Sequence, residues 1–121
     1  MNRISHTLLG AALLVLSLTA GAQTPVKAAD GTLTDAKGMT LYTFDKDAAG
    51  KSACNGPCAT NWPPMMAPAN AKVEGDWTIV TRDDGGKQWA FKGKPLYTWA
   101  KDTKPGDKTG DGVGGNWHTA K

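Results

Sequence analysis

The sequence predicts a mainly β fold: a small, loop-rich antiparallel domain built from two pseudo-symmetric repeats and closed by one disulfide. Three observations predict it. One decapeptide is written twice in nearly the same form, short β-branched and aromatic stretches alternate with Gly, Pro and Asp turns, and the only two cysteines stand close together in CNGPC. No segment shows the apolar stripe of an amphipathic helix.

The chain opens with a segment typical of a secretory signal peptide. Arg3 lies in a short polar start, an apolar run extends from Leu8 to about Ala20, and Ala20 and Ala22 have A-x-A spacing. The run is shorter than the roughly 20 residues that a membrane-spanning helix needs. We therefore expect cleavage near Ala22, no transmembrane segment, and a location in the periplasm or outside the cell.

The remaining residues, 23–121, suffice for one small domain and are too few for two. The formal charge of the full chain is +3, and the lysines are scattered rather than gathered in a stripe. This pattern excludes a nucleic-acid partner and indicates an ordinary solvated surface. We expect a monomeric domain.

The internal repeat is the strongest feature of the sequence. Residues 38–47 read GMTLYTFDKD and residues 93–102 read GKPLYTWAKD, with the two tyrosines 55 positions apart. The same offset relates the Asn-Trp pairs further along, so the register holds without insertion. Repeats of about 31–75 and 85–121 are each too small to bury a core alone, so we expect them to pack about a pseudo-twofold axis.

The strands are predicted from short apolar stretches bounded by turn residues. Residues 31–45 read as strand, DAKG turn and strand, and residues 77–82 and 87–92 form a hairpin across DDGG. Residues 95–100 extend this meander, and residues 116–120 close the chain as a last strand.

Two segments rich in Gly and Pro, 52–75 and 103–115, are expected to lack regular structure.

Strand geometry explains the repeated motif. Side chains two positions apart lie on one face of a strand, so each Tyr and the aromatic residue after it should point together into the core. Each Asp lies just beyond its strand, where it can accept hydrogen bonds from turn amides or from a Tyr hydroxyl. We expect these residues to be structural: Tyr42, Phe44, Asp47, Tyr97, Trp99 and Asp102.

The two copies of Y-x-[FWY]-x-x-D, with S-x-C-x-G-x-C-A and W-P-P between them, resemble the bacterial secreted-repeat family of predicted lipoproteins that carries the Yx(FWY)xxD motif. The resemblance covers essentially the whole mature chain. It implies a small exported protein of a family whose biochemical function is not established. The sequence departs from the lipoproteins because its first Cys is Cys54, so no acylated Cys is expected near the cleavage site.

The positions that differ between the copies are the better place to look for function. When the copies are aligned, Cys54, Cys58 and His118 match a Thr, a Val and a Pro. In an oxidising compartment a Cys54–Cys58 disulfide is the default, and so short a ring contributes only about 2 kcal/mol through loop entropy. It would staple one loop.

A copper site is the alternative interpretation of these residues. Thiolate and thioether groups favour Cu(I), and imidazole accepts either copper state. The candidate ligands are Cys54, Cys58, Met65, Met66 and His118. Thiol-redox activity is a weaker alternative, because catalytic disulfides usually have two intervening residues at the start of a helix.

Other chemistry has less support. A structural zinc site is not expected, because it needs four N or S ligands and the mature chain does not have four Cys and His residues. A calcium site would use Asp102, Asp107 and Asp111, which line one Gly-rich loop, but their spacing is not that of an EF-hand. Ser52 has no G-x-S-x-G setting. Asp47 and Asp102 would form a hydrolytic carboxylate pair only if the repeats brought them together. We therefore predict a non-catalytic binding or envelope-associated module without a cofactor.

Overall fold

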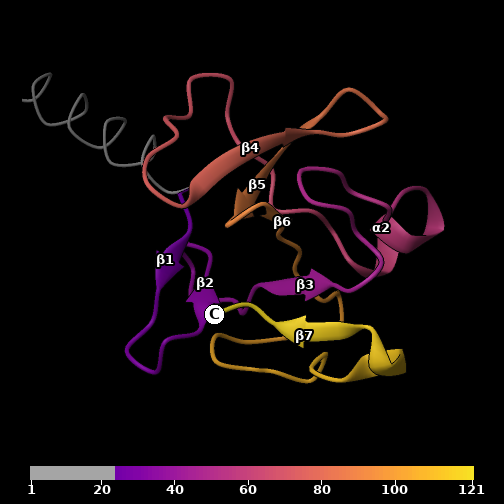
Figure 1. Cartoon of the computed structure of the whole chain (residues 1–121). Helices are drawn as coiled ribbons and strands as arrows, with labels where there is room; N and C mark the ends of the chain where they lie inside the picture. Colours follow the sequence, from indigo (N-terminus) through magenta and orange to yellow (C-terminus); the bar gives the residue numbers. More distant parts are fainter. Residues whose placement is uncertain (1–23) are drawn as a thin grey trace, which may run out of the picture.

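The computed structural model describes residues 24–121, so the predicted signal peptide, residues 1–22, lies outside the described residues. The described chain is mainly strand and loop, as expected (Figure 1). Its elements, in order, are β1 (Val26–Lys27), β2 (Leu33–Thr34), β3 (Tyr42–Phe44), α2 (Pro57–Asn61), β4 (Trp77–Thr81), β5 (Lys87–Phe91), β6 (Lys94–Pro95), the 3₁₀ helix η1 (Val113–Gly115) and β7 (Trp117–Thr119).

Three small antiparallel sheets carry the fold. They have the strand orders β1-β2, β3-β7 and β4-β5-β6. The predicted strand–turn–strand unit at residues 31–45 is present, and its turn is closed by a hydrogen bond from the Gly38 amide to the Asp35 carbonyl at 3.0 Å. The predicted β4–β5 hairpin and the last strand, β7, are also confirmed.

The expectation that residues 52–75 and 103–115 lack regular structure was wrong in two places. Helix α2 lies in the first segment and η1 in the second. Proline is tolerated at the first helical position, because the amide it lacks would have no partner there. Pro57 begins α2 in this way, and a helix of five residues is too short to show an apolar stripe.

The prediction that residues 95–100 extend the meander was correct only at its start. The paired residues of β5 and β6 end at Pro95, with a last bond from the Leu96 amide to the Trp89 carbonyl at 2.9 Å, and Tyr97 pairs instead with Tyr42 and with Pro64. Proline has no amide to donate to a ladder. Pro63 and Pro64 therefore donate no backbone hydrogen bond to this segment. The Thr98 amide still donates to the Pro63 carbonyl at 2.8 Å, but no full strand pair forms.

The two repeats exchange strands. Strand β3 of the first repeat pairs with β7 of the second, and the bridge between Tyr97 and Pro64 is the matching pairing in the other direction. At the centre, the Tyr42 amide donates to the Tyr97 carbonyl at 2.7 Å, and the Tyr97 amide donates to the Tyr42 carbonyl at 3.0 Å. The pseudo-twofold axis therefore passes between these two residues.

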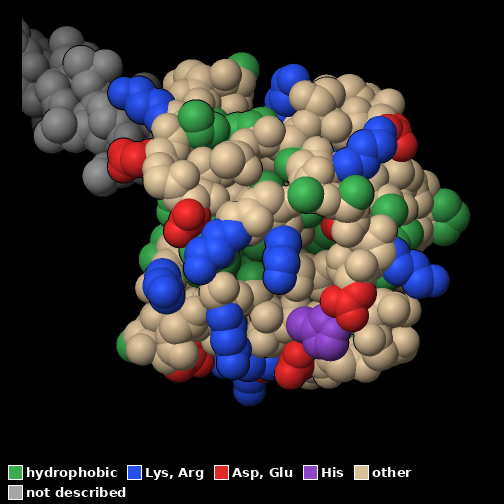
Figure 2. All heavy atoms as spheres, viewed as in Figure 1, with side chains coloured by type: hydrophobic (Ala, Val, Ile, Leu, Met, Phe, Trp, Pro, Cys, Tyr) green, Lys and Arg blue, Asp and Glu red, His purple; other side chains and the backbone are tan. Residues whose placement is uncertain are grey.

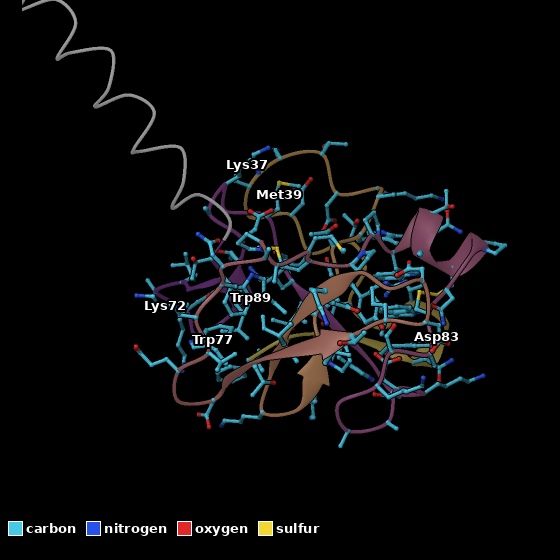
Figure 3. All side chains as sticks on the ribbon, turned by 90° about the horizontal axis from the view of Figure 1, so that it is seen from above. Lys37, Met39, Lys72, Trp77, Asp83 and Trp89 are labelled. Carbon is cyan, nitrogen blue, oxygen red and sulfur yellow. A yellow bond between two sulfur atoms is a disulfide. The ribbon has the colours of Figure 1, made fainter. Side chains whose placement is uncertain are left out.

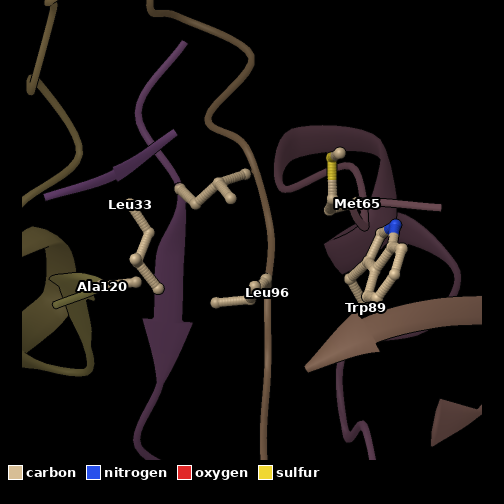
Figure 4. Close-up of a cluster of buried hydrophobic side chains, with 6 residues drawn as sticks. Leu33, Met65, Trp89, Leu96 and Ala120 are labelled. Atoms are coloured by element: carbon tan, nitrogen blue, oxygen red, sulfur yellow. The ribbon is translucent and has the colours of Figure 1, made fainter. Parts of the chain in front are cut away.

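One core cluster is built from two matching rings of backbone hydrogen bonds. In the first ring Leu41 donates to Leu33 at 2.9 Å, Leu33 to Ala120 at 2.9 Å, and Ala120 to Leu41 at 2.8 Å. Leu96, Trp89 and Met65 repeat this ring at 2.9, 2.8 and 2.9 Å. All six residues are buried and form one apolar cluster (Figure 4). Each ring joins segments from both repeats, so neither repeat completes its core alone.

The second core cluster is a stack of four aromatic rings across the pseudo-twofold axis. Trp62 and Trp117 are parallel, with ring centroids 3.8 Å apart. Phe44 stacks on the outer face of Trp117 at 4.2 Å, and Trp99 stacks on the outer face of Trp62 at 3.9 Å. Gly110 lies against the stack, where a Cβ atom would come within 2.8 Å of the Trp62 ring. The stack thus places one indole from each repeat at the centre of the molecule.

We predict that the two central indoles contribute equally to stability. Trp62→Ala and Trp117→Ala should each lower the free energy of unfolding by about 3 kcal/mol or more, because each removes a buried ring and leaves a cavity. Urea unfolding measures both. Phe44→Ala is the control and should cost less, since this half-buried ring stacks on one face only. A clear difference between the two Trp variants would contradict the symmetry.

Candidate functional site

The repeated tyrosines and aspartates are hydrogen-bonded across the two repeats. The Tyr42 hydroxyl donates to the Asp102 carboxylate at 2.7 Å, and the Tyr97 hydroxyl donates to the Asp47 carboxylate at 2.7 Å. Both tyrosines are fully buried, with no exposed surface. Each Asp therefore holds the Tyr of the other repeat, in contacts that sequence alone did not assign to a partner.

The same carboxylates also hold the loops that follow them. The second oxygen of Asp47 accepts the Ala53 amide at 2.7 Å, and that of Asp102 accepts the Thr109 amide at 3.0 Å. An Asp that accepts a turn amide fixes the local backbone. The Asp residues thus tie each loop to the strand exchange at the axis.

Burial sets the protonation of this cluster. Burial is the main cause that raises the pKa of the Tyr42 and Tyr97 hydroxyls, and the neighbouring carboxylates raise it further. Both phenols therefore remain donors at neutral pH. Burial also raises the pKa of Asp47, although the Ala53 amide and the Tyr97 hydroxyl lower it.

A buried arginine extends the network on the Asp47 side. Arg82 donates to the Ser52 hydroxyl at 3.1 Å, to the Gln88 side chain at 3.0 Å and to the Cys54 carbonyl at 2.9 Å. Ser52 in turn lies 2.6 Å from the Tyr97 hydroxyl and is 2% exposed. Ser52 is thus enclosed in a structural network rather than presented to a substrate.

The five copper candidates have separate places in the structure. Cys54 and Cys58 form the predicted disulfide. Met65 lies in the core cluster of the backbone rings, whereas Met66 is 44% exposed. The exposed His118 imidazole contacts the Asp45 carboxylate at 2.9 Å. The residues that the structure describes contain no group of three or more His, Cys, Asp or Glu side chains placed to hold a metal ion.

The three aspartates of the Gly-rich loop each bind groups of the protein. Asp107 accepts the amides of Thr103 and Lys104 at 3.0 and 3.2 Å. Asp111 accepts the Thr119 amide at 3.1 Å. With Asp102 bound to Tyr42, all three carboxylates stabilise turns and strand ends.

A groove between the β3–β7 pair and the β5–β6 turn is the strongest candidate site. It consists of two adjoining cavities of about 370 and 270 Å³ that share Thr43, Asp45, Lys92 and Lys94. Half-buried Phe44 lines the first cavity and half-buried Phe91 lines the second. The groove thus combines aromatic walls with charged side chains.

Basic side chains dominate the rim of this groove. Lys92, Lys94 and Lys121 line it together with His118. Figure 2 shows lysine side chains gathered on this face of the molecule, with the histidine and acidic side chains beside them. The groove therefore presents more positive than negative charge.

Most charges of this groove belong to one side of the pseudo-twofold axis, with the exception of Lys92, which matches Lys37 in the first repeat. When the two repeats are aligned at the offset of 55 residues, four charged or titratable side chains of the groove match uncharged residues of the other repeat. Asp45, Lys94, His118 and Lys121 match Ala100, Met39, Pro63 and Met66. Residues that maintain a symmetric scaffold would be expected on both sides, so this set is free to serve a ligand.

Lys92 adds a conformational observation. It has φ of 53°, and among the described residues it is the one non-glycine residue with positive φ. Lys92 and Gly93 form the two-residue turn between β5 and β6, where Asn-Gly or Gly-Gly is the favoured pair. Backbone strain of this kind often marks a functional position. The Lys92 side chain lines both cavities, and its ammonium nitrogen lies 5.3 Å from the Phe91 ring centroid.

Sequence reasoning found His118 but missed the lysines and Asp45 of the groove. The signal was present, because the comparison of the two copies that singled out the cysteines and His118 also separates Lys94 and Lys121 from their uncharged counterparts.

Comparison with known proteins identifies the family. A family model described as a secreted repeat of unknown function matches residues 24–66 and again residues 78–121. The chain therefore belongs to this family and contains two of its repeats. No curated protein and no solved structure matches the chain. Across residues 24–121, the helices are too short to span a membrane.

We predict that the ionisation of Asp47 opposes folding. Its raised pKa means that the folded protein holds this proton to higher pH than the unfolded chain, so wild type loses stability as pH rises from about 4 through the folded pKa. Relative to wild type, Asp47→Asn should therefore gain stability as pH rises above about 4, where the unfolded carboxyl ionises. Urea unfolding at several pH values measures the difference.

Asp107→Asn is the control with the opposite sign. The Thr103 amide is the main cause that lowers the pKa of Asp107, so wild type should gain stability over this variant as pH rises through the acid range. A difference between Asp47→Asn and wild type that is constant or falls with pH would contradict the prediction.

Proposed function

We propose that this member of the secreted-repeat family is a non-catalytic binding module that acts outside the cytoplasm, in the cell envelope or beyond it. Its ligand site is the groove between the β3–β7 pair and the β5–β6 turn. The observation that carries the proposal is the one-sided charge of this groove, which the symmetric scaffold does not need.

The chemistry of the groove favours an anionic ligand with an apolar part. Exposed ammonium groups at Lys92, Lys94 and Lys121 would attract a carboxylate, sulfonate or phosphate. Phe44 and Phe91 would contact a flat or aliphatic portion of the same molecule. Asp45 pairs with His118, which leaves the lysines as the groups that attract the ligand's charge.

The remaining polar groups support binding rather than catalysis. Asp47, which lines the first cavity, accepts hydrogen bonds from Tyr97 and Ala53, and Ser52 is enclosed behind Tyr97. These groups are engaged in holding the two repeats together. The disulfide between Cys54 and Cys58 suits an oxidising compartment such as the periplasm.

The probe for this site is 8-anilinonaphthalene-1-sulfonate, an anion with aromatic rings whose fluorescence rises in apolar surroundings. We predict that it binds the folded wild-type protein. The double variant Lys94→Met and Lys121→Met, which copies the residues at the matching positions, should bind about tenfold more weakly, since each surface ion pair is worth up to about 1 kcal/mol.

The matched control is the double variant Lys37→Met and Lys104→Met. It removes the same charge from exposed lysines that do not line the groove. Far-ultraviolet circular dichroism confirms that both double variants are folded. Equal loss of binding in the two double variants would refute the groove as the site, because it would show a dependence on net charge alone.

A further inference from the structure

The outer edge of β4 is open. Within the described residues β4 has β5 as its one sheet neighbour. The Arg82 amide donates to the Gly86 carbonyl at 2.8 Å, and the Lys92 amide donates to the Asp76 carbonyl at 2.8 Å. These two bonds lie at either end of the β4–β5 ladder and fix which residues of β4 face β5.

Hydrogen-bonded and non-hydrogen-bonded pairs alternate along an antiparallel ladder. Because positions 76 and 82 are bonded across the hairpin, Thr78 and Val80 direct their backbone groups toward β5. Ile79 and Thr81 therefore direct their amides and carbonyls to the open side. Ile79 is half-buried and Thr81 is exposed, so this edge can be reached from solvent.

The matching edge in the first repeat is protected. Leu33 and Trp89 hold equivalent places in the two backbone rings, and their partners across the strand pairs are Lys27 and Ile79. Lys27 on β1 thus corresponds to Ile79 on β4.

The residue two positions earlier differs in the same way. Pro25 in the first repeat corresponds to Trp77 in the second. Proteins commonly protect edge strands with Lys and Pro and by keeping them short, and β1 has only two residues. Strand β4 has five residues, WTIVT, without a charge or a proline. One chain therefore protects one edge and leaves its counterpart bare.

A cavity of about 400 Å³ adjoins the bare edge. Trp77 and Trp89 line it together with Pro68, Asn70, Lys72 and Glu74. Figure 3 shows Lys72, Trp77 and Trp89 near one another at one end of the hairpin. The Trp77 ring is held by Phe91, with centroids 4.7 Å apart. A strand added to β4 would have a preformed pocket for one of its side chains.

We infer that the β4 edge binds an extended polypeptide segment of a partner protein by β-strand addition. Alternating free amides and carbonyls are complementary to another backbone, which distinguishes this surface from the charged groove. Glu74 and Asp76, which precede β4, are exposed and take part in none of the ion pairs of the described chain, so the segment carries Lys or Arg.

Charge argues against a second copy of this chain as the occupant. In an antiparallel pairing of two β4 strands centred on Ile79, Asp76 of one copy lies opposite Arg82 of the other, whose guanidinium is buried and already donates to Ser52, Gln88 and the Cys54 carbonyl. A second copy therefore leaves the Asp76 carboxylates without a basic partner. A basic partner segment supplies one.

The probe is the amidated, acetylated hexapeptide KQWAFK, which copies residues 87–92. This sequence already pairs antiparallel with the other edge of β4 and has Lys at both ends. Amide hydrogen exchange of the whole mature protein is followed by NMR. In the free protein the amides of Ile79 and Thr81 should exchange faster than those of Thr78 and Val80, and the peptide should slow exchange at Ile79 and Thr81 selectively.

Thr81 provides the matched variants. Thr81→Pro removes an outward amide without removing a bond to β5 and should weaken peptide binding about fivefold, the value of one hydrogen bond. Thr81→Val keeps the amide and should bind as wild type does. Equal affinity of the two variants would overturn the inference. So would an absence of protection at millimolar peptide, protection confined to other surfaces, or protection that grows with protein concentration alone, which indicates a second copy.

Discussion

The contact between the Trp62 and Trp117 rings is the constraint on which the rest of the structure depends. Each ring comes from one repeat, and together with Phe44 and Trp99 they form a continuous stack across the pseudo-twofold axis. The stack holds the two repeats together where they exchange strands, so the backbones of Tyr42 and Tyr97 can hydrogen-bond to each other at the centre. A repeat separated from its partner would expose its indole, and each backbone ring would lose the two of its three hydrogen bonds that join different repeats.

Matching residues of the two repeats form the core at the pseudo-twofold axis. The residues that differ between the repeats are therefore the ones available for ligand binding. The charged groove, the bare β4 edge and the disulfide loop all lie at positions where the repeats differ. Gene duplication followed by divergence accounts for this division. One set of residues preserves the shared core, and the other is free to acquire ligands. The two proposed sites use different chemistry, since the groove presents ammonium groups and the edge presents backbone amides and carbonyls.

The sequence was sufficient to predict the repeat, the β class, the hairpin and the Cys54–Cys58 disulfide, because these depend on local patterns and on a fixed offset. It was not sufficient to predict the exchange of strands. Nothing in the motif around Tyr42 tells whether its hydroxyl meets Asp47 or Asp102, since both partners satisfy the same hydrogen bond. The end of the meander at Pro95 was missed for a similar reason: the prolines that weaken the pairing of Tyr97 lie in the other repeat. The groove lysines come from β6 and from the chain end after β7, which only the fold brings together.

A double-mutant cycle on the tyrosines and aspartates tests the exchange most directly. The free energy of unfolding is measured for Tyr42→Phe combined with Asp102→Asn and, separately, with Asp47→Asn. The exchanged structure predicts a coupling of about 1 kcal/mol or more between Tyr42 and Asp102, which share a hydrogen bond, and a much smaller one between Tyr42 and Asp47. Strong coupling between Tyr42 and Asp47, with none to Asp102, would show that each repeat folds on itself and would contradict the account.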